Sequence, residues 1–288
     1  MSIRTAFAAI QALSPRVAAH AALPLFRRVG PRLPVHPRDM ATHDAARRGT
    51  ITVRGHRVTT YAWGDGERPV LLVHGWRGRA SQFAPLIREL RSEGHSVVAF
   101  DAPANGDSRG RRTHVLDYSD AIRQLERRHG GFGAIVAHSF GLPSAVASVV
   151  DGVVTDRVVG IAGVAEPAHL LQQFGRMLGL SAETKSHLRR LFEQRVFPHH
   201  PGIVDRYSAL LNPLPPEVPL LLTHDRGDTV VEPSQSEQLH AVHAGRSTLV
   251  LTEGLGHRRI LSADVTLDAV MSFVSGVDSP MTEHVRLL

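Results

Sequence analysis

Three residues that lie far apart in the chain have side chains suited to attack on a carbonyl carbon. Ser139 ends an apolar run in the segment Ala-Ile-Val-Ala-His-Ser-Phe-Gly, residues 134–141. One of two aspartates, Asp225 or Asp228, follows a later apolar run of strand length, and His257 follows another. A serine hydroxyl is a poor nucleophile at neutral pH, so it needs a histidine that takes its proton and a carboxylate that orients the imidazole. These three residue types, each just after a predicted strand, indicate acyl transfer.

The segment around Ser139 predicts a sharp turn between a buried strand and a helix. Such a turn brings two backbones close together, so it needs small residues two positions before and two positions after the serine. Ala137 and Gly141 stand at those positions. The backbone N–H of Phe140 would then lie at the N-terminus of the helix, where it is available to a developing oxyanion.

From about residue 50 onwards, apolar runs of strand length alternate with segments of helical spacing. Strands that are apolar on both faces and alternate with helices predict a mostly parallel sheet covered on both sides. The first two strands form a hairpin around Gly55, which we expect at one edge of the sheet. The expected strands are Thr50–Val53, Arg57–Trp63, Val70–Val73, Ser96–Phe100, Ala134–Ala137, Val158–Ala162, Val218–Thr223 and Thr248–Leu251, and the expected helices are Ser81–Arg91, Asp117–His129, Gly141–Val150, the region near Pro233–His240 and about Ala263–Ser275.

Two stretches depart from this alternation. The stretch of about residues 165–216 has helical spacing, contains no predicted strand and has prolines at both ends. We expect it to be a small mobile helical cap, on the sheet edge that carries Ser139, that sets the acyl-chain preference; in the alternative, its apolar faces only pack on the sheet. We expect residues 1–48 to form an N-terminal helical arm and residues 49–288 to form the α/β domain.

The net charge of +6 is confined to one end of the chain. Residues 1–38 contain six arginines and no acidic residue, so the rest of the chain is balanced. A balanced body offers no basic stripe along which a phosphate backbone could lie, and we expect no nucleic-acid partner. The chain contains no cysteine, which excludes disulfides, thiolate metal ligands and a cysteine nucleophile.

The apolar stretches of the first 38 residues are too broken for a secretory signal or a membrane span. Ser14, Pro15 and Arg16 interrupt them, and none approaches the roughly 18 apolar residues that a span requires. A transit peptide fits the composition if the source is eukaryotic. We favour amphipathic helices packed against the core or a neighbouring subunit, in a cytoplasmic protein whose oligomeric state stays open.

Four motifs, in this order, resemble those of the α/β-hydrolase family. Residues 70–78, Val-Leu-Leu-Val-His-Gly-Trp-Arg-Gly, resemble its strand and H-G-x-x-G loop. Residues 100–110 resemble its D-x-P-G-x-G-x-S loop, with Ala104 in place of the first glycine. The turn at Ser139 resembles its G-x-S-x-G elbow with alanine first, and the acid and histidine loops follow in the family's order. The resemblance covers about residues 50–275. It implies an α/β-hydrolase fold: a mostly parallel central sheet flanked by helices, with a small helical cap.

The resemblance also implies the roles of the site residues. Ser139, Asp228 and His257 would be the catalytic triad, and the backbone N–H groups of Trp76 and Phe140 the oxyanion hole. The alternative acid is Asp225, which we expect to brace the loop instead.

The substrate pocket is expected around the oxyanion loop and the cap. Its candidate residues are His74, Gly75, Phe174 and Leu178, and we expect His74 and His138 to make structural hydrogen bonds rather than to act as acid–base groups. Arg258 and Arg259 would receive a substrate carboxylate or, in the interpretation we favour, stay solvated or ion-paired. No metal is expected, because the four histidines that suggest one lack a carboxylate at ligand spacing. They are His199, His200, His240 and His243.

The expected function is hydrolysis of carboxylic esters with small to medium apolar acyl groups. The partner would be a small-molecule ester, and no cofactor is needed. The same triad serves thioester, amide or C–C bond hydrolysis and cofactor-free perhydrolysis, and no residue separates these alternatives. A non-enzymatic ligand-binding member of the fold is a further alternative, but such members usually lack a triad residue.

Overall fold

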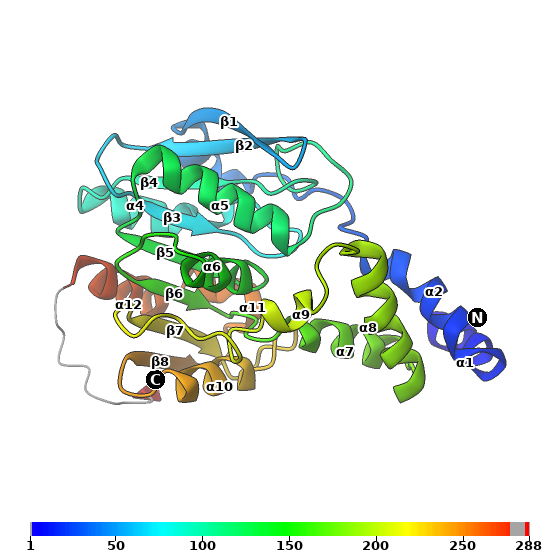
Figure 1. Cartoon of the computed structure of the whole chain (residues 1–288). Helices are drawn as coiled ribbons and strands as arrows, with labels where there is room; N and C mark the ends of the chain where they lie inside the picture. Colours follow the sequence, from blue (N-terminus) through cyan, green and yellow to red (C-terminus); the bar gives the residue numbers. More distant parts are fainter. Residues whose placement is uncertain (1, 277–285, 288) are drawn as a thin grey trace.

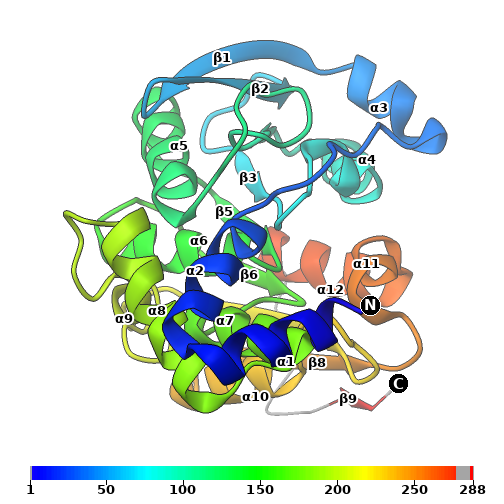
Figure 2. The ribbon, with the colours of Figure 1, turned by 90° about the vertical axis from the view of Figure 1, so that its right-hand side faces the viewer.

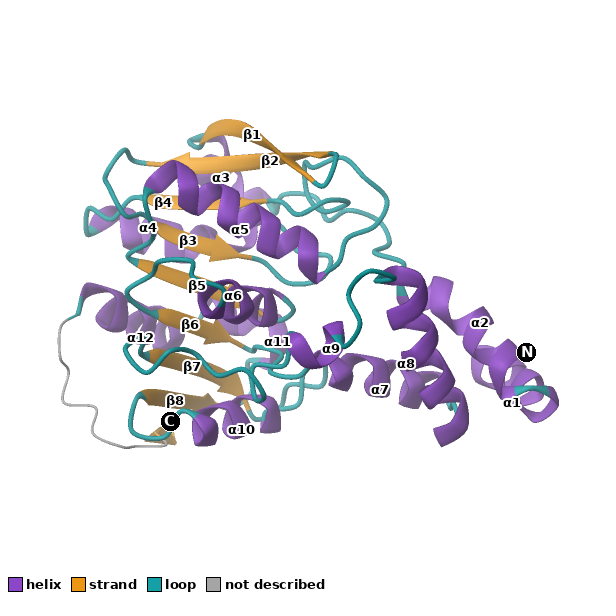
Figure 3. Cartoon of the chain, in the orientation of Figure 1, coloured by secondary structure: helices purple, strands orange, loops and turns teal. Residues whose placement is uncertain are grey.

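The computed structural model describes residues 2–276 and 286–287, and it has a central sheet between two layers of helices (Figures 1 and 3). In these residues the strands lie in the order β1-β2-β4-β3-β5-β6-β7-β8-β9. The pairs β1/β2 and β2/β4 are antiparallel and all others are parallel. The predicted mostly parallel sheet with a hairpin at one edge is therefore confirmed. The strands are β1 Arg47–Val53, β2 His56–Trp63, β3 Val70–Val73, β4 Val97–Phe100, β5 Ala134–His138, β6 Val158–Ile161, β7 Leu220–Asp225, β8 Ser247–Thr252 and β9 Arg286–Leu287.

The helices cover both faces of the sheet, because alternate side chains of each central strand point to opposite sides. Leu71 and Val73 of β3 pack in one cluster with α5, α6 and α10, whereas Val70 and Leu72 pack in the other with α4 and α12. Burying one such aliphatic side chain contributes roughly 1.5–3 kcal/mol. The helices are α1 Ile3–Leu13, α2 Pro15–Phe26, α3 Met40–Asp44, α4 Ala84–Ser92, α5 Val115–His129, α6 Gly141–Val150, α7 Pro167–Leu178, α8 Ala182–Val196, α9 Ile203–Arg206, α10 Ser234–Val242, α11 Gly256–Arg259 and α12 Asp264–Ser275.

The stretch between β6 and β7 contains α7, α8 and α9, which stand beyond the carboxyl ends of the parallel strands (Figure 1). Helices α1 and α2 lie against α7 and α8, away from the sheet (Figures 1 and 2). Ser14 begins α2 by accepting a hydrogen bond from the Val17 N–H, and Pro15 takes the first helical position, where its missing N–H costs nothing. No helix in the described part of the chain is both long and apolar enough to cross a membrane.

The side chain of Gln11 joins α1 to the loop between α7 and α8. Its amide nitrogen donates to the Gly179 carbonyl at 3.0 Å, and its amide oxygen accepts from the Ser181 N–H at 2.8 Å. The ring of Phe26, at the end of α2, contacts the rings of Phe174 at 5.2 Å and Phe192 at 5.4 Å between centroids. These contacts fix the first two helices on the helices that follow β6.

The first turn of α5 contains a buried carboxylate. Asp117 accepts a hydrogen bond from the His114 N–H at 2.9 Å and lies 3.6 Å from the guanidinium of Arg54. Burial raises the pKa of Asp117 to about 6, although these two contacts oppose the change. The folded protein therefore keeps a proton that the unfolded chain releases near pH 4.

Replacing Asp117 by asparagine is expected to change how stability depends on pH. The raised pKa favours folding below pH 4, and this contribution is lost as the pH rises through about 6. The loss amounts to at most about 3 kcal/mol, since one pKa unit corresponds to about 1.4 kcal/mol. The melting temperature of Asp117→Asn, relative to the unmodified protein, should therefore rise between pH 4 and pH 7 in thermal unfolding. Parallel curves for the two proteins would contradict this.

Candidate active site

Ser139 occupies the sharp turn between β5 and α6. Its φ of +53° is in the left-handed region that non-glycine residues seldom adopt, and its N–H donates to the Ile161 carbonyl at 3.0 Å. A Cβ on Gly141 would lie 2.6 Å from the Val73 carbonyl oxygen, so only glycine fits there. The methyl group of Ala137, in contrast, lies beside Gly160 of the neighbouring strand, which has no side chain. This neighbour explains why alanine is accommodated before the serine.

The structure brings Ser139, His257 and Asp228 into one hydrogen-bonded chain. His257, on α11 after β8, places Nε2 3.0 Å from the Ser139 Oγ and Nδ1 2.7 Å from an Asp228 carboxylate oxygen. The other carboxylate oxygen of Asp228 accepts from the N–H groups of Val230 at 2.7 Å and Val231 at 3.0 Å. The imidazole therefore lies between a hydroxyl and an immobilised carboxylate.

A residue that the sequence analysis missed, His224, lies beside the carboxylate. This buried β7 residue places Nε2 3.4 Å from the Asp228 carboxylate and 3.0 Å from the Val231 carbonyl oxygen. Burial alone would raise the pKa of Asp228, but hydrogen bonds from His224, His257 and the Val231 N–H outweigh it and hold the pKa well below its usual range. Asp228 is therefore ionised at neutral pH. No signal in the sequence pairs His224 with Asp228, because the end of a strand and the loop after it have no fixed spacing at which side chains meet.

Asp225 has a different position from Asp228. One of its carboxylate oxygens accepts from the Gly227 N–H at 2.9 Å. The other accepts from the Thr252 hydroxyl at 2.9 Å and the Leu255 N–H at 2.8 Å. Asp225 thus joins the loop after β7 to the loop after β8 and makes no hydrogen bond to His257.

His138 is hydrogen-bonded to the backbone of α11. Its Nε2 donates to the His257 carbonyl at 3.0 Å, and the two imidazole rings lie 4.8 Å apart. Burial, followed by the nearby His257 ring, lowers the pKa of His138 to about 3, so its ring is neutral at neutral pH. A neutral ring can hold the α11 backbone without placing a second positive charge beside His257.

Two backbone N–H groups beside Ser139 have no acceptor among the described residues. They belong to Trp76, after β3, and Phe140, at the N-terminus of α6. A Cβ on Gly75 would lie 2.7 Å from the Ser139 Cβ, so the loop approaches the serine closely only because residue 75 is glycine. Free N–H donors beside a serine hydroxyl suit the oxygen of a tetrahedral intermediate.

His74, a predicted pocket residue, holds this loop and is not part of the cavity wall described below. Its buried ring accepts from the Ala102 N–H at 2.9 Å and donates to the Gly75 carbonyl at 2.7 Å. Burial lowers the pKa of His74, which favours the neutral ring that these two bonds require. Both ring nitrogens of His74 are hydrogen-bonded within the protein, so neither is available to a substrate.

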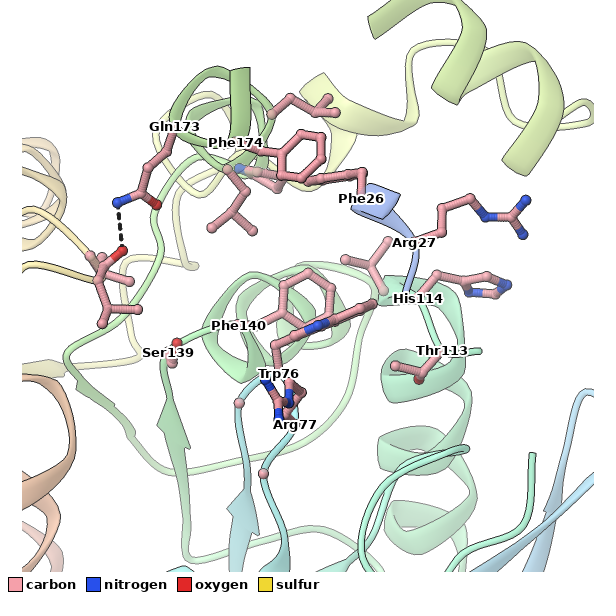
Figure 4. A pocket seen from close by; sticks show the side chains of 18 of the residues that line it. Phe26, Arg27, Trp76, Arg77, Thr113, His114, Ser139, Phe140, Gln173 and Phe174 are labelled. Carbon is pink, nitrogen blue, oxygen red and sulfur yellow. Dashed lines mark hydrogen bonds between the residues drawn. The ribbon is translucent and has the colours of Figure 1, made fainter. Parts of the chain in front are cut away.

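A cavity of about 920 Å³ opens beside Ser139 and His257. In Figure 4 the rings of Trp76 and Phe140 lie on one side of it, and those of Phe26 and Phe174 on the other. Helices α2, α7, α8 and α9 all contribute to its wall, together with the loops after β3 and β5. The apolar residues of the wall are Leu25, Phe26, Trp76, Val115, Phe140, Pro167, Leu170, Leu171, Phe174, Met177, Phe192, Val196, Phe197, Ile203, Val204, Val230 and Val231.

Of the other three predicted pocket residues, two line the cavity and one does not. Gly75 and Phe174 line it, but Leu178 does not. Leu178 is 1% exposed and lies one turn beyond Phe174 on α7, at the end of the helix that is buried in the core. Leu178 therefore packs in the core and is not part of the cavity wall. Phe26 was missed, since nothing in its sequence context links the N-terminal segment to the cavity.

The other charged and metal-type candidates have ordinary surroundings. Arg258 lines the cavity, whereas the Arg259 guanidinium donates to the Leu255 carbonyl at 3.0 Å. His240 contacts the Ser247 hydroxyl at 2.8 Å, and the ring of His243 accepts from the Leu214 N–H at 3.0 Å. In the described residues, no group of three or more histidines and carboxylates could hold a metal ion.

Comparisons with known proteins agree with this architecture. The family model described as "Alpha/beta hydrolase family" matches residues 70–269. Among solved structures, mouse alpha/beta hydrolase domain-containing protein 10 is 15% identical over 82% of this chain and 100% of its own, with a TM-score of 0.64. An esterase from Pyrococcus furiosus is 18% identical over 87% and 96%, with a TM-score of 0.61. The thioesterase domain from the curacin biosynthetic pathway is 15% identical over 81% and 99%, with a TM-score of 0.55.

A search of the curated proteins finds no match. At these identities the solved structures share the fold, and the family model covers most of the chain, including β3, the serine turn and the loops of Asp228 and His257. The chain therefore belongs to the alpha/beta hydrolase family.

Proposed function

We propose that the protein is a serine hydrolase that cleaves carboxylic esters of small to medium apolar acyl groups. The observation that carries the proposal is the position of His257, whose two ring nitrogens contact the Ser139 hydroxyl and the Asp228 carboxylate. In this arrangement the imidazole can take the hydroxyl proton while an ionised carboxylate stabilises the imidazolium that forms. The apolar wall of the cavity suits the acyl group.

The reaction would run through an acyl-enzyme. Ser139 Oγ attacks the ester carbonyl carbon as its proton moves to His257 Nε2, and the carbonyl oxygen becomes an oxyanion. The N–H groups of Trp76 and Phe140 would stabilise that oxyanion, each by roughly 3 kcal/mol. His257 then returns the proton to the departing alkoxide. A water molecule, deprotonated by the same imidazole, releases the acid and restores Ser139.

We also propose that the arm, residues 1–48, and the cap, residues 165–216, together form the roof of the substrate cavity. Phe26 from the arm and Phe174 from the cap pack on each other and both line the cavity. The arm would then be part of the substrate site and not only a surface attachment.

The proposed function is tested with p-nitrophenyl acetate, butyrate, octanoate and laurate, and with the matching acyl thioesters. We expect kcat/KM to be highest for an intermediate ester and lower for the thioesters. Turnover of the thioesters alone would transfer the proposal to thioester hydrolysis. Absence of turnover together with absence of labelling by a fluorophosphonate would refute a serine hydrolase.

Two neighbouring positions on α7 separate substrate selection from packing. Phe174→Ala enlarges the cavity, so the ester chain-length optimum should move to longer chains while acetate turnover stays nearly unchanged. Leu178→Ala is the matched control: it removes a core side chain, which should cost about 2–5 kcal/mol of stability and leave the length profile unchanged. Steady-state kinetics and thermal unfolding of both variants check this. An identical length profile in Phe174→Ala would exclude its contact with substrate.

A further inference from the structure

The wall of the cavity contains five arginines and no carboxylate. Arg176 is paired with Glu232 at 2.8 Å. The other four have no carboxylate within ion-pair distance and no hydrogen-bond acceptor for the guanidinium among the described residues. An apolar ester has no anionic group that these four guanidinium groups could bind. The four are Arg27, Arg28, Arg77 and Arg258.

Arg27 is the most constrained of these four side chains. It follows Phe26 at the carboxyl end of α2 and is half-buried. Burial and the nearby guanidinium of Arg112 both lower the pKa of Arg27. Two guanidinium groups without a carboxylate between them repel one another, and an anion placed between them would remove that repulsion.

The surroundings of Arg27 are polar, unlike the middle of the cavity. In Figure 4, Arg27, His114 and Thr113 lie at the end farther from Ser139, and the four aromatic rings lie between the two ends. Burial, followed by Arg54, lowers the pKa of His114 to about 4, so its imidazole is neutral and can donate one N–H at neutral pH. The cavity therefore has a nucleophile at one end, an aromatic passage and a cationic hydrogen-bonding pole at the other.

We propose that the substrate carries a carboxylate or phosphate group that binds Arg27, joined to the scissile carbonyl through an apolar segment lying between the aromatic rings. This proposal rests on the proposed function and narrows its substrate class to anionic amphiphilic esters. The anion belongs either to the acyl chain or to the leaving group. Guanidinium and imidazole donors suit both anions, and the aromatic rings exclude water from the segment between.

Matched substrates test the charge and its position. Mono-p-nitrophenyl suberate has its carboxylate on the acyl chain, and p-nitrophenyl methyl suberate is its neutral counterpart. 6-Carboxyhexyl octanoate has its carboxylate on the leaving group, and its methyl ester is the neutral counterpart. In one of the two pairs we expect kcat/KM to favour the anion by about 10- to 100-fold, the size of a charge-assisted hydrogen bond. Added salt should reduce that preference.

Variants assign the preference to Arg27. Arg27→Gln should abolish the preference by lowering kcat/KM for the anionic ester far more than for its neutral counterpart, and Arg27→Lys should restore part of it. Arg16→Gln is the control, because Arg16 is exposed on the same helix and does not line the cavity. Equal rates for anionic and neutral esters in both pairs, or a preference that survives in Arg27→Gln, would overturn the proposal.

A binding measurement keeps this test independent of turnover. Monomethyl suberate should raise the melting temperature of the Ser139→Ala protein more than dimethyl suberate does, and Arg27→Gln should remove the difference. If esters are bound with this preference but never cleaved, the anion site stands and the proposed function fails. If neutral esters are cleaved and the anion gives no advantage in rate or binding, the proposed function stands and the anion site fails.

Discussion

Replacing Ser139 by alanine is expected to lower kcat for the best p-nitrophenyl ester by about 10⁶-fold, because the chain then has no nucleophile at the turn before α6. The fold should survive. Alanine lacks only the hydroxyl, and the Ser139 backbone, whose N–H and carbonyl hold the turn together, is unchanged. The melting temperature should therefore stay near that of the unmodified protein while activity disappears.

Covalent labelling locates the nucleophile directly. A fluorophosphonate probe should modify the peptide that contains Ser139 and should not modify Ser139→Ala. Ser148→Ala is the matched control, since the Ser148 hydroxyl is buried on α6, the helix that follows the Ser139 turn, and only donates to the Ser144 carbonyl. Labelling of another serine, or persistence of labelling in Ser139→Ala, would show that the nucleophile is elsewhere.

Replacing Asp228 by asparagine is expected to lower kcat by about 10⁴-fold. The amide is neutral and, with its N–H₂ group toward His257, would favour the tautomer in which Nε2 carries the proton and cannot accept it from Ser139. His224 adds to the loss, because its contact with an ionised carboxylate becomes a contact with a neutral amide. The pH profile and kcat of the variant, measured with a saturating ester, check this.

Asp225→Asn is the control, and we expect it to reduce stability rather than kcat. Asp225 accepts one hydrogen bond within its own loop and two that join this loop to the end of β8 and the loop after it, and it makes none to His257. Asparagine keeps one acceptor oxygen and loses the other, so stability should fall by about 1–3 kcal/mol with a much smaller loss of kcat. If Asp225→Asn were the more damaging substitution for kcat at full folding, Asp228 would not be the acid.

The sheet could be predicted because its signals are local. Each buried strand is a short apolar run between turn residues, and the order of the motifs fixes which strand ends carry Ser139, Asp228 and His257. The serine turn was recognisable despite Ala137, because a turn of this kind needs a small residue there and not specifically a glycine. The positions of these three side chains follow from topology, which brings the carboxyl ends of β5, β7 and β8 to one edge.

The pocket could not be predicted in the same way, because it depends on how helices rotate and pack. Phe174 and Leu178 lie one turn apart on the same side of α7, so their spacing predicts a helix but not that the cavity reaches Phe174 and stops short of Leu178. Phe26 meets Phe174 only after two distant segments dock. His224 is hidden for a related reason: its ring and the Asp228 carboxylate meet only after the loop following β7 folds back on the strand.

The docking of the first two helices on α8 constrains the order in which the protein can be completed during synthesis. Gln11 emerges from the ribosome early, but Ser181, to which it is hydrogen-bonded, follows 170 residues later. Until then the buried face of α2, formed by Ala18, Ala19, Ala22 and Leu23, lacks the contacts that α8 supplies and is available to chaperones or to another nascent chain. Strands β1 to β6 precede α8 in the chain, so they can pair before the arm has α8 to pack on. The walls of the cavity close last, so a chain stalled before α8 would present the serine turn without a roof.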